Sequence, residues 1–142
     1  GAAFYRRAAA LVNNDDAKKL LEDLAVLEEE HEVIFENLRA DPEFLSEILG
    51  DPDGKTCRYL RALTDGVIFS GAENPADRLE GAVDISQIIK TAIDLEIASI
   101  VFYQGIRELI TTESRGGKLD AIIAEERRHV IILSEALTNF SQ

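Results

Sequence analysis

The spacing of side chains between positions 85 and 110 constrains the fold more than any other feature of this chain. A stripe recurs there at alternating intervals of four and three residues, and its members are Ile85, Ile89, Ala92, Glu96, Ser99, Tyr103, Ile106 and Ile110. Such spacing keeps side chains on one face of an α-helix. The stretch therefore predicts a helix whose buried face includes a glutamate, Glu96.

Three further segments show helical character. Residues 4–12, FYRRAAALV, are typical of the end of a first helix that is closed by the polar residues at 13–16. A second helix is predicted from about 17 to 40, with a stripe of Leu20, Leu24, Leu27, His31, Phe35 and Leu38. A fourth is predicted after Gly116-Gly117, with a stripe of Leu119, Ile122, Glu126, His129, Leu133, Ala136 and Phe140.

These segments predict an all-α chain with a single domain over residues 1–142. Residues 41–84 form a long connection between the second and third helices, in which EFLSEIL and CRYLRALTDGVIF are candidate short helices. Two pairs of helices with short links, joined by one long crossover, have the connectivity of a ferritin-like four-helix bundle. We therefore expect that architecture.

Composition excludes several classes of function. The formal net charge is −12, which argues against nucleic-acid binding, because phosphate contacts depend on basic patches. No apolar run reaches the roughly 20 residues that a membrane span requires. Cys57 is the only cysteine. It cannot form a disulfide within the chain, so a reducing, cytoplasmic location is expected.

An internal repeat contains the residues with chemical potential. Phe4-Tyr5 recurs as Phe102-Tyr103, and Glu28 with His31 recurs as Glu126 with His129, both at an offset of 98 residues. Each histidine follows its glutamate by three positions, which places the pair on one helical face. The two halves of the chain therefore share one register.

Carboxylates on the buried face of a helix are costly unless they are neutralised, paired or bound to metal. The predicted buried stripes of the second, third and fourth helices contain no Lys or Arg. Carboxylate oxygens together with imidazole nitrogens suit iron, manganese or zinc. Simpler readings also exist: the Glu-His pairs could be a surface charge run, and Glu96 could bond to a hydroxyl such as that of Ser99 or of a tyrosine.

The chain resembles the rubrerythrin branch of the ferritin-like superfamily. The resemblance covers nearly the whole chain and rests on FYRRAAA near the start, EEEH at 28–31, EIASIVFY at 96–103 and EERRH at 125–129. It implies a centre with two iron ions, for which manganese or zinc is an alternative. The implied metal ligands are Glu28, His31, Glu96, Glu126 and His129, and Tyr5 and Tyr103 are the implied neighbouring tyrosines.

Two departures from this family qualify the function. Ser99 stands where peroxide-reducing rubrerythrins usually have a further glutamate, and the paired CxxC motifs of a rubredoxin-like domain are absent. The leading expectation is redox chemistry on peroxide or dioxygen, in a homodimer that receives electrons from an external donor. The alternatives are an iron-handling protein without catalysis, and a structural bundle whose site is empty or holds zinc.

The remaining acidic residues near the motifs are expected to be mostly solvated. These are Glu29, Glu30, Glu32 and Glu125, of which Glu125 adjoins a ligand and could replace it. The repeat also makes a prediction about residues before Gly1. Glu96 precedes Phe102 by six positions, so its counterpart precedes Phe4 by six. We expect a longer natural N-terminus with a glutamate at that point.

Overall fold

The computed structural model describes residues 1–50, 53–63, 79 and 84–140. Its helices are α1 (Ala2–Leu11), α2 (Asp15–Arg39), α3 (Pro42–Leu49), α4 (Lys55–Leu63), α5 (Ile85–Arg107) and α6 (Glu113–Phe140). The described residues contain no β-strand, which confirms the prediction of an all-α chain. Within the same residues, no helix has both the length and the apolar character that crossing a membrane would require.

The ends of α2 follow from local chemistry. The side chain of Asn14 accepts a hydrogen bond from the backbone N–H of Ala17 at 2.9 Å, and Asp15 and Asp16 lie in the first turn, where carboxylates favour the positive end of the helix. The helix ends at Arg39, just before Asp41-Pro42. The predicted helix over 17–40 is therefore present, and it begins two residues earlier.

The connection between α2 and α5 contains two short helices. α3 begins with Pro42, and the Asp41 side chain caps it by accepting from the backbone N–H of Glu43 at 3.0 Å. Both EFLSEIL and the first seven residues of CRYLRALTDGVIF are helical, in α3 and α4 respectively. The rest of the second segment lies outside the described residues.

α6 corrects one sequence-based boundary. The helix begins at Glu113 and continues through Gly116-Gly117, whereas the two glycines were predicted to precede it. The reason is a close contact with the end of α5: a Cβ atom at Gly116 would lie 2.6 Å from Cζ of Arg107. Arg107 also bonds to the Ile110 carbonyl and to Asp120, at 3.0 Å each. Gly116 thus makes room for an arginine and does not break the helix.

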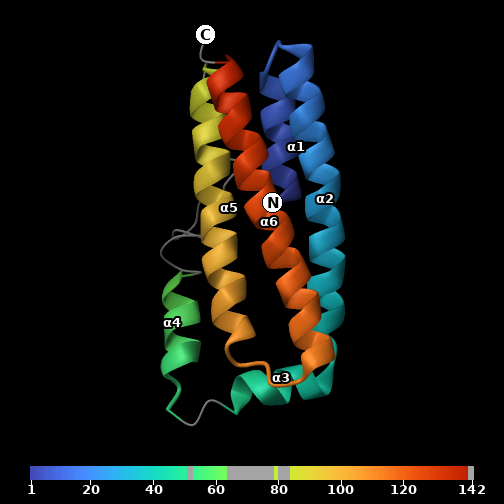
Figure 1. Ribbon diagram of the computed structural model, residues 1–142, viewed down its shortest axis with the longest axis vertical. Helices are drawn as coiled ribbons and strands as arrows, with labels where there is room; N and C mark the ends of the chain where they lie inside the picture. Colours follow the sequence, from blue (N-terminus) through green and yellow to red (C-terminus); the bar gives the residue numbers. More distant parts are fainter. Residues whose placement is uncertain (51–52, 64–78, 80–83, 141–142) are drawn as a thin grey trace.

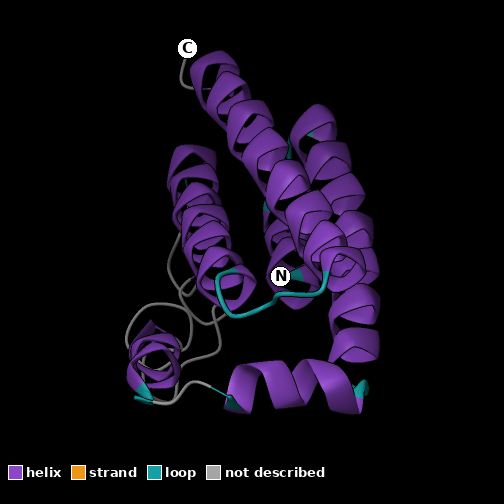
Figure 2. Cartoon of the chain, turned by 60° about the horizontal axis from the view of Figure 1, so that its bottom comes forward, coloured by secondary structure: helices purple, strands orange, loops and turns teal. Residues whose placement is uncertain are grey.

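Four helices share one core. α1 packs along the first half of α2, and α5 packs along α6 (Figure 1). The larger apolar cluster takes buried residues from all four, for example Phe4 of α1, Leu24 of α2, Ile89 of α5 and Leu133 of α6. A second cluster, around Phe44, lies at the end of the molecule where α3 crosses beneath the long helices (Figure 2).

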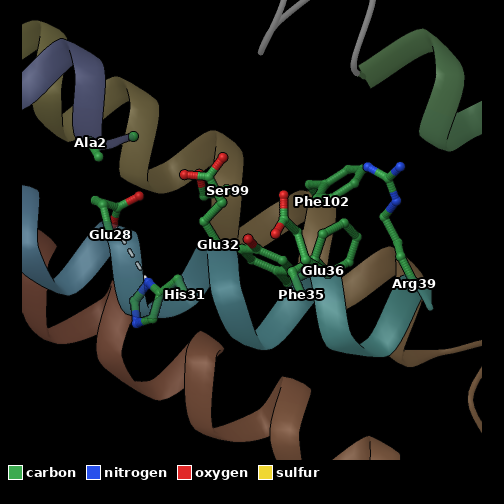
Figure 3. A pocket seen from close by; sticks show the side chains of 11 residues that line it. Ala2, Glu28, His31, Glu32, Phe35, Glu36, Arg39, Ser99 and Phe102 are labelled. Atoms are coloured by element: carbon green, nitrogen blue, oxygen red, sulfur yellow. Dashed lines mark ion pairs between the residues drawn. The ribbon is translucent and has the colours of Figure 1, made fainter. Parts of the chain in front are cut away.

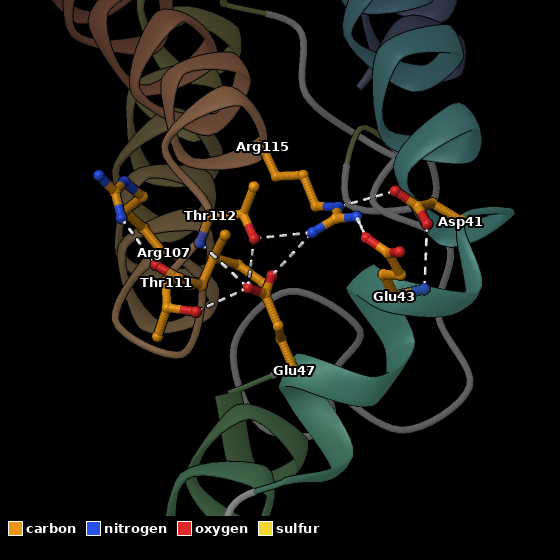
Figure 4. Close-up of polar contacts among 8 residues, drawn as sticks. Asp41, Glu43, Glu47, Arg107, Thr111, Thr112 and Arg115 are labelled. Atoms are coloured by element: carbon orange, nitrogen blue, oxygen red, sulfur yellow. Dashed lines mark hydrogen bonds and ion pairs between the residues drawn. The ribbon is translucent and has the colours of Figure 1, made fainter.

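A polar network fastens α3 to the start of α6 (Figure 4). Arg115 donates from Nε to Asp41 at 2.7 Å and from Nη1 to the hydroxyl of Thr112 at 2.8 Å. Oε1 of Glu47 accepts from the hydroxyls of Thr111 and Thr112, at 2.8 Å each, and from the Thr112 backbone N–H at 3.0 Å. These bonds hold the α5–α6 turn against α3.

A core substitution provides a test of this packing. Leu133 is fully buried in the larger cluster, so Leu133→Ala is expected to lower the free energy of unfolding of the metal-free protein by about 2–5 kcal/mol. Ile131, on the same helix, is 58% exposed, and Ile131→Ala is expected to change it by less than about 0.5 kcal/mol. Urea unfolding followed by circular dichroism measures both. Equal losses in the two variants would contradict the assigned orientation of α6.

Candidate metal centre

Three helices bring a group of ionisable side chains into the apolar interior. His31 of α2, Glu96 of α5, and Glu126 and His129 of α6 are each no more than 2% exposed. The side chain of Glu28, one turn before His31, is 11% exposed. His31, Glu96, Glu126 and His129 lie on the apolar stripes of their helices, as the spacing in the sequence predicted, and Glu28 shares the face of His31. The core is therefore interrupted by a layer of carboxylates and imidazoles.

Glu126 lies between the two histidines. Its Oε1 is 3.4 Å from Nδ1 of His31, and its Oε2 is 3.2 Å from Nδ1 of His129. One carboxylate therefore presents a different oxygen to each imidazole. Glu126 therefore contacts both histidines at once.

Glu28 approaches the same two nitrogens from α2. Its Oε1 lies 3.6 Å from Nδ1 of His31 and 3.6 Å from Nδ1 of His129. The imidazole rings are stacked, with centroids 5.6 Å apart and an interplanar angle of 23°. The two Glu-x-x-His pairs thus face each other across the centre, as expected from a repeat whose halves share one register.

Glu96 belongs to one side of this arrangement. Its Oε2 is 3.7 Å from Nδ1 of His129, and its Oε1 accepts a hydrogen bond from the hydroxyl of buried Tyr5. Ligand atoms of Glu28, Glu96, Glu126 and His129 all lie within 4.8 Å of one another, so these four side chains can hold a metal ion. His31 is not one of these four, but its Nδ1 lies 3.6 Å from Glu28 and 3.4 Å from Glu126.

Most of the separations are longer than hydrogen bonds, and they lie at or slightly above the spacing of two atoms that bind one ion. Most of these N···O distances, 3.4–3.7 Å, exceed the usual 2.7–3.2 Å of an N–H···O bond. Two ligand atoms that bind one ion at about 2.1 Å lie roughly 3.0–3.4 Å apart in octahedral or tetrahedral geometry. Nδ1 of His31 and Oε1 of Glu28 are also buried without a hydrogen-bond partner. The donor set therefore fits a metal ion.

Protons on the histidines balance the carboxylates when no metal is bound. Burial disfavours a charged imidazole, but the surrounding carboxylates of Glu126, Glu28 and Glu125 outweigh burial and raise the pKa of His31 to about 10. Burial also disfavours a charged His129, but its carboxylate neighbours outweigh burial and raise the pKa of His129 to about 11. Both histidines therefore carry a positive charge at neutral pH.

The carboxylates respond in opposite directions. Burial raises the pKa of Glu96 to about 8, against the hydrogen bond from His129, and the charge of Glu126 adds to the rise. Burial also opposes ionisation of Glu126, but its bonds to His129 and His31 prevail and lower its pKa. The Glu28 pKa is lowered for the same reason. Near neutral pH, two carboxylates and two imidazolium groups offset each other.

A cavity of about 470 Å³ adjoins the centre (Figure 3). Glu28 and His31 of α2 form one end of it, and α5 contributes Ser99, Phe102 and Tyr103 to its wall. Ser99 is thus placed beside the centre. Its hydroxyl leaves more space there than a glutamate would.

The two tyrosines of the repeat have different surroundings. Tyr5 donates to Glu96, and burial together with that carboxylate raises its pKa well above the ordinary value. Tyr103 is partly buried, packs edge-on against Phe35 at 5.6 Å and lines the cavity. Burial and the nearby carboxylates raise its pKa also. Of these two tyrosines, Tyr5 is the one whose hydroxyl hydrogen-bonds to a predicted ligand within the described residues.

Glu125 has a contact that the sequence did not predict. Its Oε2 lies 2.7 Å from Nε2 of His31, on the opposite edge of the ring from the carboxylate cluster. The sequence suggested a solvated residue or a substitute ligand. The available signal was its position directly before Glu126, but the pairing depends on how α6 is rotated relative to α2.

Comparison of the chain with protein-family models, with curated proteins and with solved structures found no match. Without a match, only a general conclusion follows from the site. An all-helical chain brings together a cluster of glutamates and histidines that is able to hold a metal ion.

The protonated histidines predict that metal binding depends on pH. Their raised pKa values mean that the folded, metal-free protein keeps these protons until the pH approaches 10, so an incoming ion must displace about two protons near pH 7. Metal affinity is expected to rise from pH 6 to pH 9. Calorimetric titration with Co²⁺ in buffers of different ionisation enthalpy measures the protons released.

The same shifts act on stability in the absence of metal. The stabilisation from these histidine protons is complete below the unfolded-state pKa of about 6.5 and is lost as the pH rises through 10 and 11.

For the calorimetric titration, a Co²⁺ affinity that is independent of pH, with no proton release, would contradict the assigned protonation.

Proposed function

We propose that this chain is a ferritin-like four-helix bundle of the rubrerythrin type that binds two iron ions and reduces peroxide or dioxygen. The observation that carries the proposal is the position of Glu126, whose two oxygens face two different histidines at 3.4 and 3.2 Å. One ion would need only one of these imidazoles. Two imidazoles that share two carboxylates fit two neighbouring ions.

The ligands divide into a shared pair and individual ones. Glu28 and Glu126 contact both histidines and would bridge the ions. His31 would bind one ion, and His129 together with Glu96 would bind the other. This is close to the ligand set of ferritin-like dinuclear proteins, in which two Glu-x-x-His motifs are combined with a glutamate from each of the other two helices.

The donor chemistry favours iron, with manganese or zinc as alternatives. Carboxylate and imidazole ligands suit all three ions, but zinc has no redox chemistry. Two ferrous ions would supply the two electrons that, with two protons, convert hydrogen peroxide into two water molecules. The carboxylates would offset the change in charge at the ions, while the Tyr5 hydroxyl holds Glu96 through its hydrogen bond.

The cavity supports access by a small oxidant. It reaches Glu28 and His31 directly, and its volume of about 470 Å³ is ample for a peroxide molecule. A reductant must then return electrons to the oxidised ions, and we expect an external donor protein to do so. That donor, a homodimeric assembly and a cytoplasmic location remain predictions.

Ser99 favours a second candidate function, iron handling without rapid catalysis. Its short hydroxyl side chain borders the cavity where a glutamate would offer another carboxylate. With fewer movable carboxylates, the centre would follow a change in iron charge less readily. Oxidation of the iron would then be slow, and the protein would serve to hold or pass on the metal.

Anaerobic loading with Fe²⁺ tests the leading proposal. The parent protein is expected to bind close to two ions per chain, and addition of hydrogen peroxide is expected to oxidise both. Glu126→Gln should weaken binding of both ions by more than about 100-fold, because even partners that only support a ligand are worth 10–100-fold. Glu135→Gln, at an exposed position of the same helix, is the matched control.

Metal analysis after desalting gives the stoichiometry, and stopped-flow absorbance after mixing with peroxide gives the rate. Absence of bound iron in the parent protein would refute the proposal. Bound iron that peroxide oxidises only over many minutes would support the iron-handling candidate instead.

Ser99→Glu separates the two candidates further. A carboxylate at this position would project into the cavity beside Glu28, so the rate at which peroxide oxidises the reduced centre is expected to rise. Ser99→Gln is similar in size and lacks the charge, and it serves as the control. An equal change in both variants would assign the effect to cavity volume alone.

A further inference from the structure

A row of carboxylates lines the cavity beside the centre. Three glutamates of α2, Glu28, Glu32 and Glu36, belong to its lining at intervals of four residues. Residues four apart are neighbours on one face of an α-helix, and Figure 3 shows the three side chains on the same side of α2. Glu28 belongs to the candidate centre, whereas Glu32 and Glu36 are exposed. The row therefore leads from solvent to the centre.

Helix stability and ion pairing do not explain this row. Like charges four residues apart repel each other and destabilise a helix. Glu29 of the same helix forms an ion pair with Arg6, but no described side chain forms an ion pair or hydrogen bond with the carboxylates of Glu32 and Glu36. Among the described residues that line the cavity, Arg39 is the one basic side chain. The two outer carboxylates are therefore available to a cation from solvent.

The inner end of the row is a polar group that lacks a hydrogen-bond partner. His31 is 2% exposed and lines the cavity, and its Nδ1 has no such partner. Oε1 of Glu28 is also buried without one, and it lies 3.6 Å from that nitrogen. Buried polar atoms without partners are costly. This end of the cavity is therefore suited to a ligand that the outer carboxylates can attract.

The wall of the cavity strengthens the effect of these charges. Phe35 and Phe102 contribute aromatic rings to the lining, and charges beside an apolar wall are screened less than charges in bulk water. The charge of Glu32 also acts on the inner wall: burial raises the pKa of Tyr103, the ligand carboxylates raise it further, and Glu32 adds to the rise. Clefts that carry one sign of charge speed the arrival of oppositely charged ligands.

We propose that Glu32 and Glu36 form an entry path that captures divalent cations and passes them to Glu28. The inference rests on the proposed dinuclear centre. A cation would exchange part of its water for carboxylate oxygens and then move by about one helical turn, roughly 5.4 Å, from one glutamate to the next. Uncharged peroxide gains nothing from such a path. Glu32 and Glu36 therefore determine how fast a metal ion arrives, and the centre itself determines how firmly the ion is held.

Stopped-flow mixing of the metal-free protein with Co²⁺ under anaerobic conditions tests this, because the visible absorbance of bound Co²⁺ reports its arrival without turnover. At an ionic strength of about 10 mM, Glu32→Gln is expected to slow association by about 3–10-fold, and the double variant with Glu36→Gln by more. Competition with a chelator measures the affinity, which should change by less than about threefold, because exposed charges contribute little to it. In about 1 M salt, screening should remove most of the difference in rate.

Two variants separate the path from the overall charge of the protein. Glu30→Gln is the matched control, because Glu30 is an exposed glutamate of the same helix and does not line the cavity. It removes the same charge, and its association rate should equal that of the parent. Arg39→Gln removes the basic side chain of the lining, so it should speed association at low salt. An effect of net charge alone would slow association equally in Glu30→Gln and Glu32→Gln.

The outcomes are distinct. If Glu32→Gln and the double variant bind Co²⁺ as fast as the parent, or are slowed no more than Glu30→Gln, the entry path is wrong. If the affinity of Glu32→Gln falls as much as its rate, at high as well as at low salt, Glu32 is a ligand of the bound ion and the path is again wrong. Failure of the parent protein to bind Co²⁺ would instead refute the proposed dinuclear centre, whatever the variants show.

Discussion

Burial of ionisable side chains between two apolar clusters is the constraint on which the rest of this structure depends. Along α2, Leu24 and Ala25 belong to one cluster and Leu38 to the other, with Glu28 and His31 between them. The same order is found on α5, and it is reversed on α6. Packed side chains therefore bound the charged layer at both ends, and the cavity beside Glu28 and His31 adjoins it from the side. The buried members of the layer must neutralise one another.

Two kinds of cation can satisfy this layer. Without metal, protons on His31 and His129 offset the charges of Glu28 and Glu126, and Glu96 retains its own proton near neutral pH. An ion that binds takes over the role of those protons. Both Nδ1 atoms are directed at the shared carboxylates of Glu28 and Glu126. Proton release and metal binding are two aspects of one exchange.

The sequence was sufficient for features that depend on a single helix. A glutamate and a histidine three positions apart share a face whatever the surroundings, so the inward position of Glu126 and His129 followed from spacing alone. Asp41-Pro42 marked the end of α2 for an equally local reason. The start of α6 did not follow, because Gly116 is explained by the Arg107 side chain of another helix.

Features that depend on the rotation of one helix against another were beyond the sequence. Glu125 is adjacent to a predicted ligand, yet nothing in EERRH indicates that it reaches the outer nitrogen of His31, 94 positions earlier. The cavity beside Ser99 could not be predicted from the sequence either, because its wall combines side chains of α2 and α5. Spacing determines which residues face inward, but packing determines which of them meet.

The repeat sets a limit on how alike the two halves of the centre can be. Duplicated motifs give each half a Glu-x-x-His pair, and the shared carboxylates Glu28 and Glu126 have similar distances to both histidines. Differences must then arise at positions just outside the motifs. The offset of 98 residues pairs Glu125 with Leu27, directly before the two motifs. Glu125 contacts the outer edge of the His31 ring, and a leucine cannot make such a contact. The two histidines thus share the inner carboxylates but differ in what lies at the outer edge of the ring.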